Sequence, residues 1–215
     1  MFNRTTAYIL IVALAAGLGL WAATRYFGPA GGAPAPELQT VRLFQPVRTL
    51  PPFELTQSDG TPLEPSELQG HWTAVFLGFT HCPDVCPTTL AELARAQKAW
   101  ESIPEPTRPR VLFVSVDPER DTPELIGQYA HAFHTDTLAA TGSLPALEQL
   151  AASLSMVFAK VPPPEGVPAD QYSIDHSATI AVLDPQGRMA GLIRPPLEPA
   201  KIAADLAALT GDARP

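Results

Sequence analysis

Three strand-length runs of apolar residues constrain the fold of this chain more than any other feature. They are "TAVFLGF" at residues 73–79, "RVLFVSV" at residues 110–116 and "ATIAVL" at residues 178–183. A continuous apolar run, as opposed to one that alternates with polar residues, is typical of a central strand covered on both faces. The segments between these runs carry apolar residues at helical spacing. This alternation predicts an α/β domain with a central mixed sheet flanked by helices.

The amphipathic segments predict four helices. In the first, Leu90, Leu93 and Trp100 share one helical face, as expected of a helix that packs on a sheet. Asp121 or Thr122 is the expected N-cap of the second, because short oxygen-bearing side chains accept hydrogen bonds from the free N–H groups of a first helical turn. The predicted helices cover residues 88–100, 122–133, 144–154 and 198–209.

The amino-terminal residues differ in composition from the rest of the chain. Residues 7–23, "AYILIVALAAGLGLWAA", carry no charge. As a helix they would extend over roughly 26 Å, close to the thickness of the hydrocarbon core of a membrane. We expect residues 1–27 to form an uncleaved membrane anchor. A cleaved secretory signal is the alternative, because Arg4 supplies a basic start, but the apolar run exceeds the roughly 7–15 residues usual in such signals.

Composition also sets the boundaries of the remaining parts. Residues 28–49 include "GPAGGAPAPE", a tract of proline, glycine and alanine that predicts an extended tether. Residues 50–215 are then expected to form the folded domain. The formal net charge of -8, without a basic cluster, argues against a nucleic acid partner, because the phosphate backbone attracts lysine and arginine.

The chain has two cysteines, Cys82 and Cys86, and both lie in the segment "GFTHCPDVCPTTL". This segment follows the first predicted strand and leads into the first predicted helix. Ligands of open α/β sheets bind at that edge, and the free N–H groups of a helix start favour a cysteine thiolate. A strand, a turn with two cysteines and a helix, followed by further strands and a closing helix, is typical of a thioredoxin-like fold.

The spacing of the two cysteines leaves two chemical interpretations. Thioredoxin-type oxidoreductases separate their cysteines by two residues, whereas three residues lie between Cys82 and Cys86. Two thiolates that face a shared point suit a soft ion such as Cu(I), and an imidazole would complete a three-coordinate site. A disulfide between Cys82 and Cys86 is the alternative at this spacing.

A histidine far along the chain is the expected third ligand. His176 lies in the loop that enters the third predicted strand, and in thioredoxin-like proteins this loop faces the cysteine turn. His71 precedes the first strand at its opposite end, and the side chain of His81 is expected to point away from its cysteine neighbour. His131 and His134 belong to the polar side or the end of the second helix, where a solvated surface position is expected.

Three segments, in order along the chain, resemble the signature blocks of the Sco/SenC family. They are "GFTHCPDVCPTTL", "VSVDPERDTPE" and "YSIDHSATIAVLDPQG". This family consists of membrane-tethered, thioredoxin-like copper chaperones for cytochrome c oxidase, and the resemblance covers residues 50–209 as well as the anchor and tether. It implies that Cys82, Cys86 and His176 bind copper, as Cu(I) or Cu(II), and that Asp84 and Asp117 lie near the metal.

The resemblance implies a single-pass metallochaperone that carries one copper ion to the copper-site subunit of cytochrome c oxidase. Its other expected partners are a second periplasmic copper chaperone and a thiol reductant, and its expected place is the bacterial inner membrane with the domain in the periplasm. A thiol-disulfide reductase that keeps the oxidase cysteines reduced through a redox-active disulfide of Cys82 and Cys86 is the alternative. A thiol peroxidase is a third hypothesis, because Thr80 lies two residues before Cys82.

Other residues near these blocks have a structural interpretation. The segment after the second strand can be a plain connection to the next helix, in which Asp121 caps the helix and Arg120 forms an ion pair on the surface. Met156 and Met189 are expected to fill the core. The proline-rich segment "KVPPPEGVPADQ" at residues 160–171 is expected to lie beside the metal, where it bears on the choice of partner.

Overall fold

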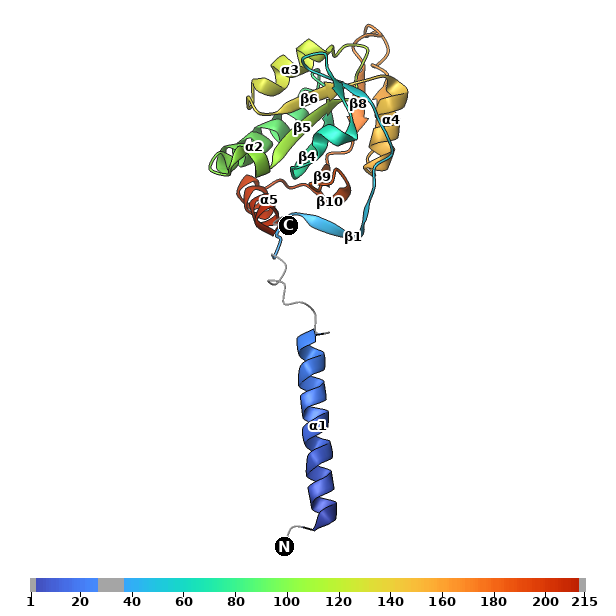
Figure 1. Ribbon diagram of the computed structural model, residues 1–215. Helices are drawn as coiled ribbons and strands as arrows, with labels where there is room; N and C mark the ends of the chain where they lie inside the picture. Colours follow the sequence, from blue (N-terminus) through green and yellow to red (C-terminus); the bar gives the residue numbers. More distant parts are fainter. Residues whose placement is uncertain (1–2, 27–36, 213–215) are drawn as a thin grey trace. The chain divides into compact units, whose positions relative to one another are not determined.

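The computed structural model describes residues 3–26 and 37–212, which belong to two separate units (Figure 1). The first contains helix α1, Arg4–Tyr26, whose apolar stretch Arg4–Ala23 has a mean hydropathy of 2.0. By length and composition this helix can cross a membrane, as predicted. Of the predicted tether, residues 28–49, the part up to residue 36 lies outside the described residues.

The second unit is built on an eight-stranded sheet with the order β1-β10-β9-β4-β5-β6-β2-β3. β4, β5 and β6 run parallel to one another, while β9 and β2 pair with them in the antiparallel direction. The sheet is therefore mixed, as predicted. Its strands are β1 Arg42–Arg48, β2 Leu55–Gln57, β3 Pro62–Leu63, β4 Thr73–Gly78, β5 Arg110–Ser115, β6 Leu138–Thr141, β9 Ile180–Leu183 and β10 Met189–Ile193.

Strand β4 lies in the middle of the sheet, and all six of its residues are buried. It pairs in parallel with β5, where Thr73 lies opposite Arg110, and in the antiparallel direction with β9, where Thr73 lies opposite Leu183. The three apolar runs of the sequence thus form three neighbouring strands covered on both faces. Met156 and Met189 are buried in the core, as predicted.

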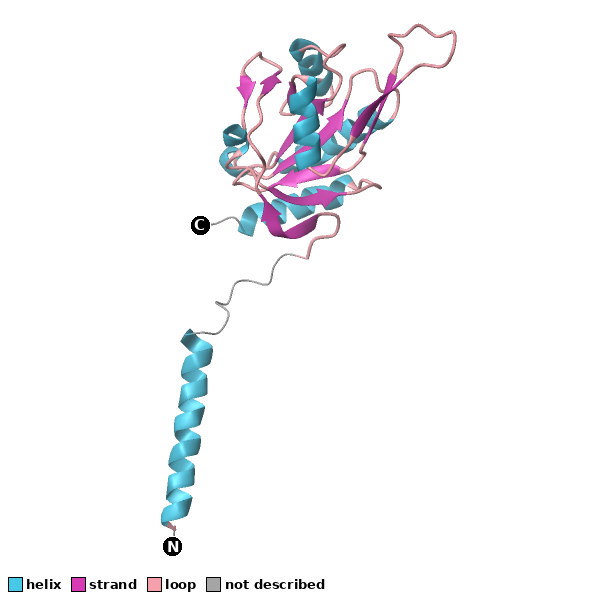
Figure 2. Cartoon of the chain, turned by 90° about the vertical axis from the view of Figure 1, so that its right-hand side faces the viewer, coloured by secondary structure: helices cyan, strands magenta, loops and turns pink. Residues whose placement is uncertain are grey.

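Helices lie on both sides of the strands (Figure 2). α2 and α5 pack against each other (Figure 1), and the Trp100 indole donates a hydrogen bond to the Ala203 carbonyl at 3.0 Å. The Thr122 hydroxyl caps α3 by accepting from the Leu125 N–H at 3.3 Å. All four predicted helices form, as α2 Val85–Trp100, α3 Pro123–His131, α4 Leu144–Ser153 and α5 Pro199–Asp212, and short 3-10 helices cover Pro65–Leu68 and Glu105–Thr107.

The compact second unit includes the residues from Glu37 onward, so it also contains β1, which precedes the domain start expected at residue 50. β1 pairs with β10, and Arg42 lies opposite Leu192. The Asp205 carboxylate of α5 accepts hydrogen bonds from the backbone N–H groups of residues 39–41 at 2.7–3.0 Å. β1 is an edge strand, where exposed residues and a proline are tolerated. Its sequence "RLFQPVR" therefore lacks the apolar pattern of the central strands.

A β-hairpin absent from the predicted elements forms a second, two-stranded sheet. β7, Phe158–Val161, pairs in the antiparallel direction with β8, Ser173–His176, so that Phe158 lies opposite His176. Both strands are short and mostly exposed, and the sequence therefore favoured a loop. His176 ends a strand instead of lying in a loop. The residues that connect the two strands, coloured orange, lie at the top of the folded unit in Figure 1.

Candidate metal centre

Both cysteines follow the carboxyl end of β4. Cys82 lies in the turn, where its N–H donates to the Phe79 carbonyl at 3.3 Å, and Cys86 is the second residue of α2. The Cys86 N–H points at the Cys82 sulfur, 3.4 Å away. The Cys82 sulfur therefore takes the place of a side-chain acceptor at the start of α2.

Gly78, the last residue of β4, leaves room for the Cys86 side chain. A Cβ atom at this position would lie 2.9 Å from the Cys86 sulfur and 2.9 Å from a ring atom of Phe113. Both distances are too short for van der Waals contact, so a larger residue would displace the thiol. Cys86 is buried beneath this edge of the sheet, whereas Cys82 is half-buried.

His176 brings an imidazole to the two sulfurs from the end of β8. Its Nε2 atom lies 3.3 Å from the Cys86 sulfur, and the nitrogen and both sulfurs lie within 4.8 Å of one another. Ligand atoms that share one ion through bonds of roughly 2.0–2.3 Å lie within about 4.6 Å of one another. Small side-chain adjustments would therefore let all three reach a single ion.

The His176 ring is oriented by contacts on both of its sides. Its Nδ1 atom lies 3.2 Å from the Ser177 carbonyl oxygen, which can only accept a hydrogen bond, so Nδ1 carries the proton. The neutral ring then presents the Nε2 lone pair to the sulfurs. Phe76 and Phe79 pack edge-to-face on the ring, with centroids 5.7 and 6.1 Å away.

Burial sets the charge of the metal-free site. It raises the pKa of the Cys86 thiol well above its ordinary value, and it lowers the pKa of the His176 imidazole, against smaller effects of the Ser177 carbonyl and Asp175. Cys86 is therefore a neutral thiol, which differs from the thiolate that its place at a helix start predicted. A bound cation would displace its proton, because the metal ligand is the thiolate.

Clefts adjoin the site on two sides. One, of about 240 Å³, is lined by the hairpin residues 157–159 and 175–177, including His176. Another, of about 400 Å³, lies against the start of α2 and is lined by residues that include Asp84, Val85 and Leu197. The Val85 side chain is exposed. The smaller cleft reaches the site at His176, and the Cys82 sulfur belongs to a half-buried residue.

The two predicted aspartates lie in different surroundings. Asp84 is the N-cap residue of α2 and is exposed in the larger cleft, and its side chain makes no capping hydrogen bond. Asp117 is buried, and its carboxylate accepts hydrogen bonds from Arg120 Nε and the Tyr172 hydroxyl, both at 2.6 Å. Asp117 therefore links the turn after β5, to which it belongs, to the residue that precedes β8.

Asp121 does not act as the predicted helix cap, and Arg120, predicted to pair on the surface, pairs instead with the buried Asp117. Asp121 is buried and accepts hydrogen bonds from the Thr80 N–H at 2.9 Å, the Thr80 hydroxyl at 2.5 Å and the Ser115 hydroxyl at 2.5 Å. Thr122 supplies the cap of α3 instead. His81 lies 3.7 Å from Asp121 and groups with the carboxylates of Asp117 and Asp121. The carboxylates of this group are already occupied by hydrogen bonds within the protein.

The remaining histidines lie elsewhere, as predicted. His71 is buried, and its Nδ1 atom lies 2.8 Å from the Arg108 carbonyl oxygen. His131 is exposed in the last turn of α3, as expected, whereas the His134 side chain, 3.8 Å from Glu101, is largely buried and not the solvated surface group that was expected. Of the five histidines, His176 is the one that groups with the cysteines in the described part of the chain.

A family model described as SCO1/SenC matches residues 43–211 of the chain. A "Putative copper-binding protein" of Stutzerimonas stutzeri is 34% identical over 153 residues, which cover 70% of this chain and 72% of that protein. The match covers 39–54% of the length of its plant and mammalian mitochondrial relatives.

Solved structures share the fold of the second unit. Bradyrhizobium japonicum ScoI with copper bound is 33% identical, with a TM-score of 0.65, and the match covers 74% of this chain and 98% of that one. The apo Sco1 protein from Thermus thermophilus is 36% identical, with a TM-score of 0.67, and the match covers 83% of this chain and 99% of that one.

Proposed function

The chain belongs to the SCO1/SenC family, and on that premise we propose that it binds one copper ion through Cys82, Cys86 and His176 and delivers the ion to a copper site of cytochrome c oxidase. One observation carries this proposal. The His176 Nε2 atom lies 3.3 Å from the Cys86 sulfur, and both group with the Cys82 sulfur within 4.8 Å.

The donor set favours copper over harder cations. Two thiolates and one imidazole are soft or intermediate ligands, and three-coordinate sites of this kind suit Cu(I). The Stutzerimonas relative is named as copper-binding, and the Bradyrhizobium relative was solved with copper bound. Asp84, exposed in the cleft beside the start of α2, would then face an approaching partner.

Transfer can proceed by ligand exchange. Copper binding displaces the thiol protons, and Nε2 of the neutral His176 ring supplies the third bond. Three ligands leave the ion open on the solvent side, next to the half-buried Cys82. A ligand of the acceptor can enter there before a cysteine leaves, so that release requires no unfolding of the domain.

The redox state of the cysteines would control loading. In an oxidising compartment, Cys82 and Cys86 can lose two protons and two electrons to an oxidant and form a disulfide, which removes both thiolates. A thiol reductant must then restore the pair before copper binds. We therefore include a reductant among the partners, with the copper-site subunit of the oxidase and a periplasmic copper donor.

Helix α1 supports a place at a membrane. Its apolar stretch Arg4–Ala23 is long enough to span a bilayer once. We assign the chain to the bacterial inner membrane with the folded unit in the periplasm, because copper delivery to the oxidase occurs on that side. A protease added to intact spheroplasts should degrade the folded unit, and protection from the protease would contradict this orientation.

A thiol-disulfide reductase is the second candidate function. The Cys82 sulfur accepts the Cys86 N–H at 3.4 Å at a helix start and, being half-buried, is the more accessible of the two sulfurs to a disulfide substrate. This activity would not need the imidazole. Reduction of a disulfide peptide by a His176→Ala variant at the wild-type rate would favour it, and loss of reduction in that variant would oppose it.

Copper titration tests the main proposal. The reduced full chain in detergent should bind one Cu(I), measured by competition with a chelator of known affinity. Cys82→Ala, Cys86→Ala and His176→Ala should each weaken binding by more than about 100-fold, because changes outside the ligands alone cost roughly 10–100-fold. His81→Ala is the matched control and should bind as the wild type does. Wild-type affinity in any of the three ligand variants would contradict the site.

A further inference from the structure

Beside the metal centre, two cations enclose the ring of Tyr172. The Arg120 guanidinium carbon lies 3.6 Å and the Lys160 ammonium 3.7 Å from the ring centroid. Two cationic groups this close to the centroid would collide on one face, so they lie on opposite faces. Contacts of this kind are attractive because the faces of an aromatic ring carry partial negative charge. Tyr172 is 7% exposed, and the ring is therefore held between the cations with little solvent.

The carboxylates of Asp117 and Glu119 lie next to the Tyr172 hydroxyl. The hydroxyl donates to Asp117 at 2.6 Å and lies 3.4 Å from Glu119. Asp117 also accepts from Arg120 Nε at 2.6 Å, and Glu119 accepts from Lys160 at 2.7 Å. Each cation on the ring is thus paired with a carboxylate next to the hydroxyl. Burial, followed by the hydrogen bond to Asp117, raises the pKa of Tyr172, so the hydroxyl stays protonated and remains a donor.

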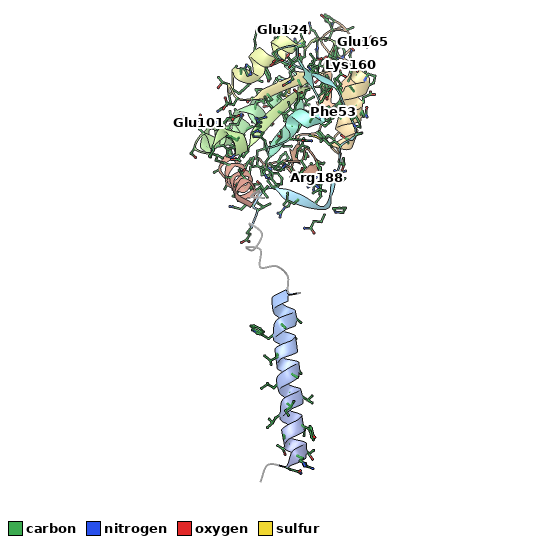
Figure 3. The ribbon with its side chains drawn as sticks, in the orientation of Figure 1. Phe53, Glu101, Glu124, Lys160, Glu165 and Arg188 are labelled. Atoms are coloured by element: carbon green, nitrogen blue, oxygen red, sulfur yellow. The ribbon has the colours of Figure 1, made fainter. Side chains whose placement is uncertain are left out.

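The cluster joins the main sheet to the hairpin. Asp117, Glu119 and Arg120 belong to the turn that follows β5, whereas Lys160 lies in β7 and Tyr172 immediately precedes β8. Arg120 also donates to the backbone carbonyls of residues 170 and 172 at 3.1 and 3.0 Å. Lys160, labelled in Figure 3, lies on the same side of the folded unit as Glu165 of the hairpin loop.

The hairpin needs such support because it pairs with no strand of the main sheet in the described residues. An isolated pair of short strands is marginally stable in water. His176 is the last residue of β8, four positions after Tyr172, and lies opposite Phe158 of β7. The place of the imidazole therefore depends on contacts that fix the hairpin on the turn after β5.

We propose that Asp117, Glu119, Arg120, Lys160 and Tyr172, here named the hairpin clasp, position the β7–β8 hairpin so that His176 meets Cys86. They are positioning residues, because they act on the metal site through the backbone of β8. The inference rests on the proposed function only where His176 acts as a copper ligand. Its claim about the place of the hairpin concerns the metal-free chain and can be tested without copper.

Tyr172→Phe is the sharpest probe, because it keeps the ring between the cations and removes the hydroxyl. Tyr129→Phe is the matched control, since the buried Tyr129 hydroxyl has no hydrogen-bond partner among the described residues. Lys160→Met is a second probe at a half-exposed position, and it removes one cation from the ring. Lys201→Met is its control, because it breaks a solvent-accessible ion pair between Lys201 of α5 and Glu198, the residue before α5.

Amide hydrogen exchange of the reduced, metal-free full chain in detergent is the first measurement. Tyr172→Phe and Lys160→Met should speed exchange in residues 158–161 and 173–176 by about tenfold or more and leave the amides of β4 and β5 unchanged, as expected of local opening. If these residues instead supported the stability of the whole domain, the substitutions would speed exchange both in the hairpin and in β4 and β5. Unchanged hairpin exchange in both variants would overturn the proposal.

Cu(I) affinity is the second measurement. Both variants should bind copper roughly 10–100-fold more weakly than their controls, the usual loss when a residue that orients a ligand is removed. A loosened hairpin with wild-type copper affinity would overturn the positioning role. If the wild-type chain bound no copper, the proposed function would fail, while the exchange data would still decide whether the clasp holds the hairpin.

Discussion

The Nε2 atom of His176 lies 3.3 Å from the sulfur of Cys86, although 90 positions separate the two residues. Cys86 is fixed in the first turn of α2, and His176 is fixed at the end of a hairpin outside the main sheet. The site is therefore assembled from one half at the start of α2, beside the main sheet, and one half on a hairpin outside that sheet. Copper binding and release should respond to changes on either half.

On the cysteine side of the site, Gly78 leaves the space that the Cys86 sulfur occupies. Gly78→Ala would put a Cβ atom 2.9 Å from that sulfur, and overpacking of this kind usually costs roughly 1–3 kcal/mol. Urea unfolding should show this loss, and Cu(I) affinity should fall as the sulfur is displaced. Gly211→Ala, where a Cβ meets no atom within 4 Å, is the control. Equal unfolding midpoints for the two variants would contradict the packing argument.

The hydrogen bonds between the Asp205 carboxylate and the backbone of residues 39–41 predict that the free energy of unfolding depends on pH. Burial would raise the pKa of Asp205, but the hydrogen bonds from Gln39, Val41 and Thr40 outweigh it and hold the pKa below its usual range. Because the folded-state pKa is lowered, the contribution to stability is complete above the unfolded value of about 3.9 and is lost as pH falls through the folded value.

Asp205→Ala measures that contribution. At pH 7 the variant should lose roughly 1–3 kcal/mol of the free energy of unfolding, because three backbone N–H groups, including that of the buried Val41, lose their acceptor. The difference from the wild type should shrink as pH falls below about 3.9. Urea titrations at several pH values provide the measurement. A difference that stays constant down to pH 3 would rule out the ionised carboxylate as its source.

Oxidation should abolish copper binding. A disulfide between Cys82 and Cys86 removes two of the three proposed ligands, and the chain should then retain almost no Cu(I) after gel filtration. Reduction with a phosphine should restore one copper per chain. The Cys82→Ser variant, which cannot form the bridge, should bind weakly and should not respond to oxidation. Full copper occupancy in the oxidised wild type would show that the ligands lie elsewhere.

The sequence was most informative where residues are buried from both sides. β4, β5 and β9 correspond to the three continuous apolar runs, because central strands exclude polar residues on either face. β1 was missed, since an edge strand that contains Arg42, Pro46 and Arg48 has no such pattern. β7 and β8 were missed for a related reason, because most of their residues face solvent.

The grouping of Cys82 and Cys86 with His176 was more predictable from the sequence than the contacts that support it. Cys82 and Cys86 stand at a strand end before a helix, and the order of the three sequence blocks pointed to His176. The contact of Tyr172 with Asp117 joins residues 55 positions apart, and no local pattern marks it. The raised pKa of Cys86 was also hidden, because it follows from burial beneath Gly78 and not from the place of the thiol at a helix start.

X-ray absorption at the copper edge tests the central claim most directly. The reduced full chain loaded with one Cu(I) should show two sulfur ligands at about 2.3 Å and one nitrogen ligand at about 2.0 Å, distances typical of thiolate and imidazole bonds to a similar ion. His81→Ala should give the same spectrum, and His176→Ala should keep the sulfurs and lose the imidazole nitrogen. An imidazole signal that persists unchanged in His176→Ala would contradict the three-ligand site.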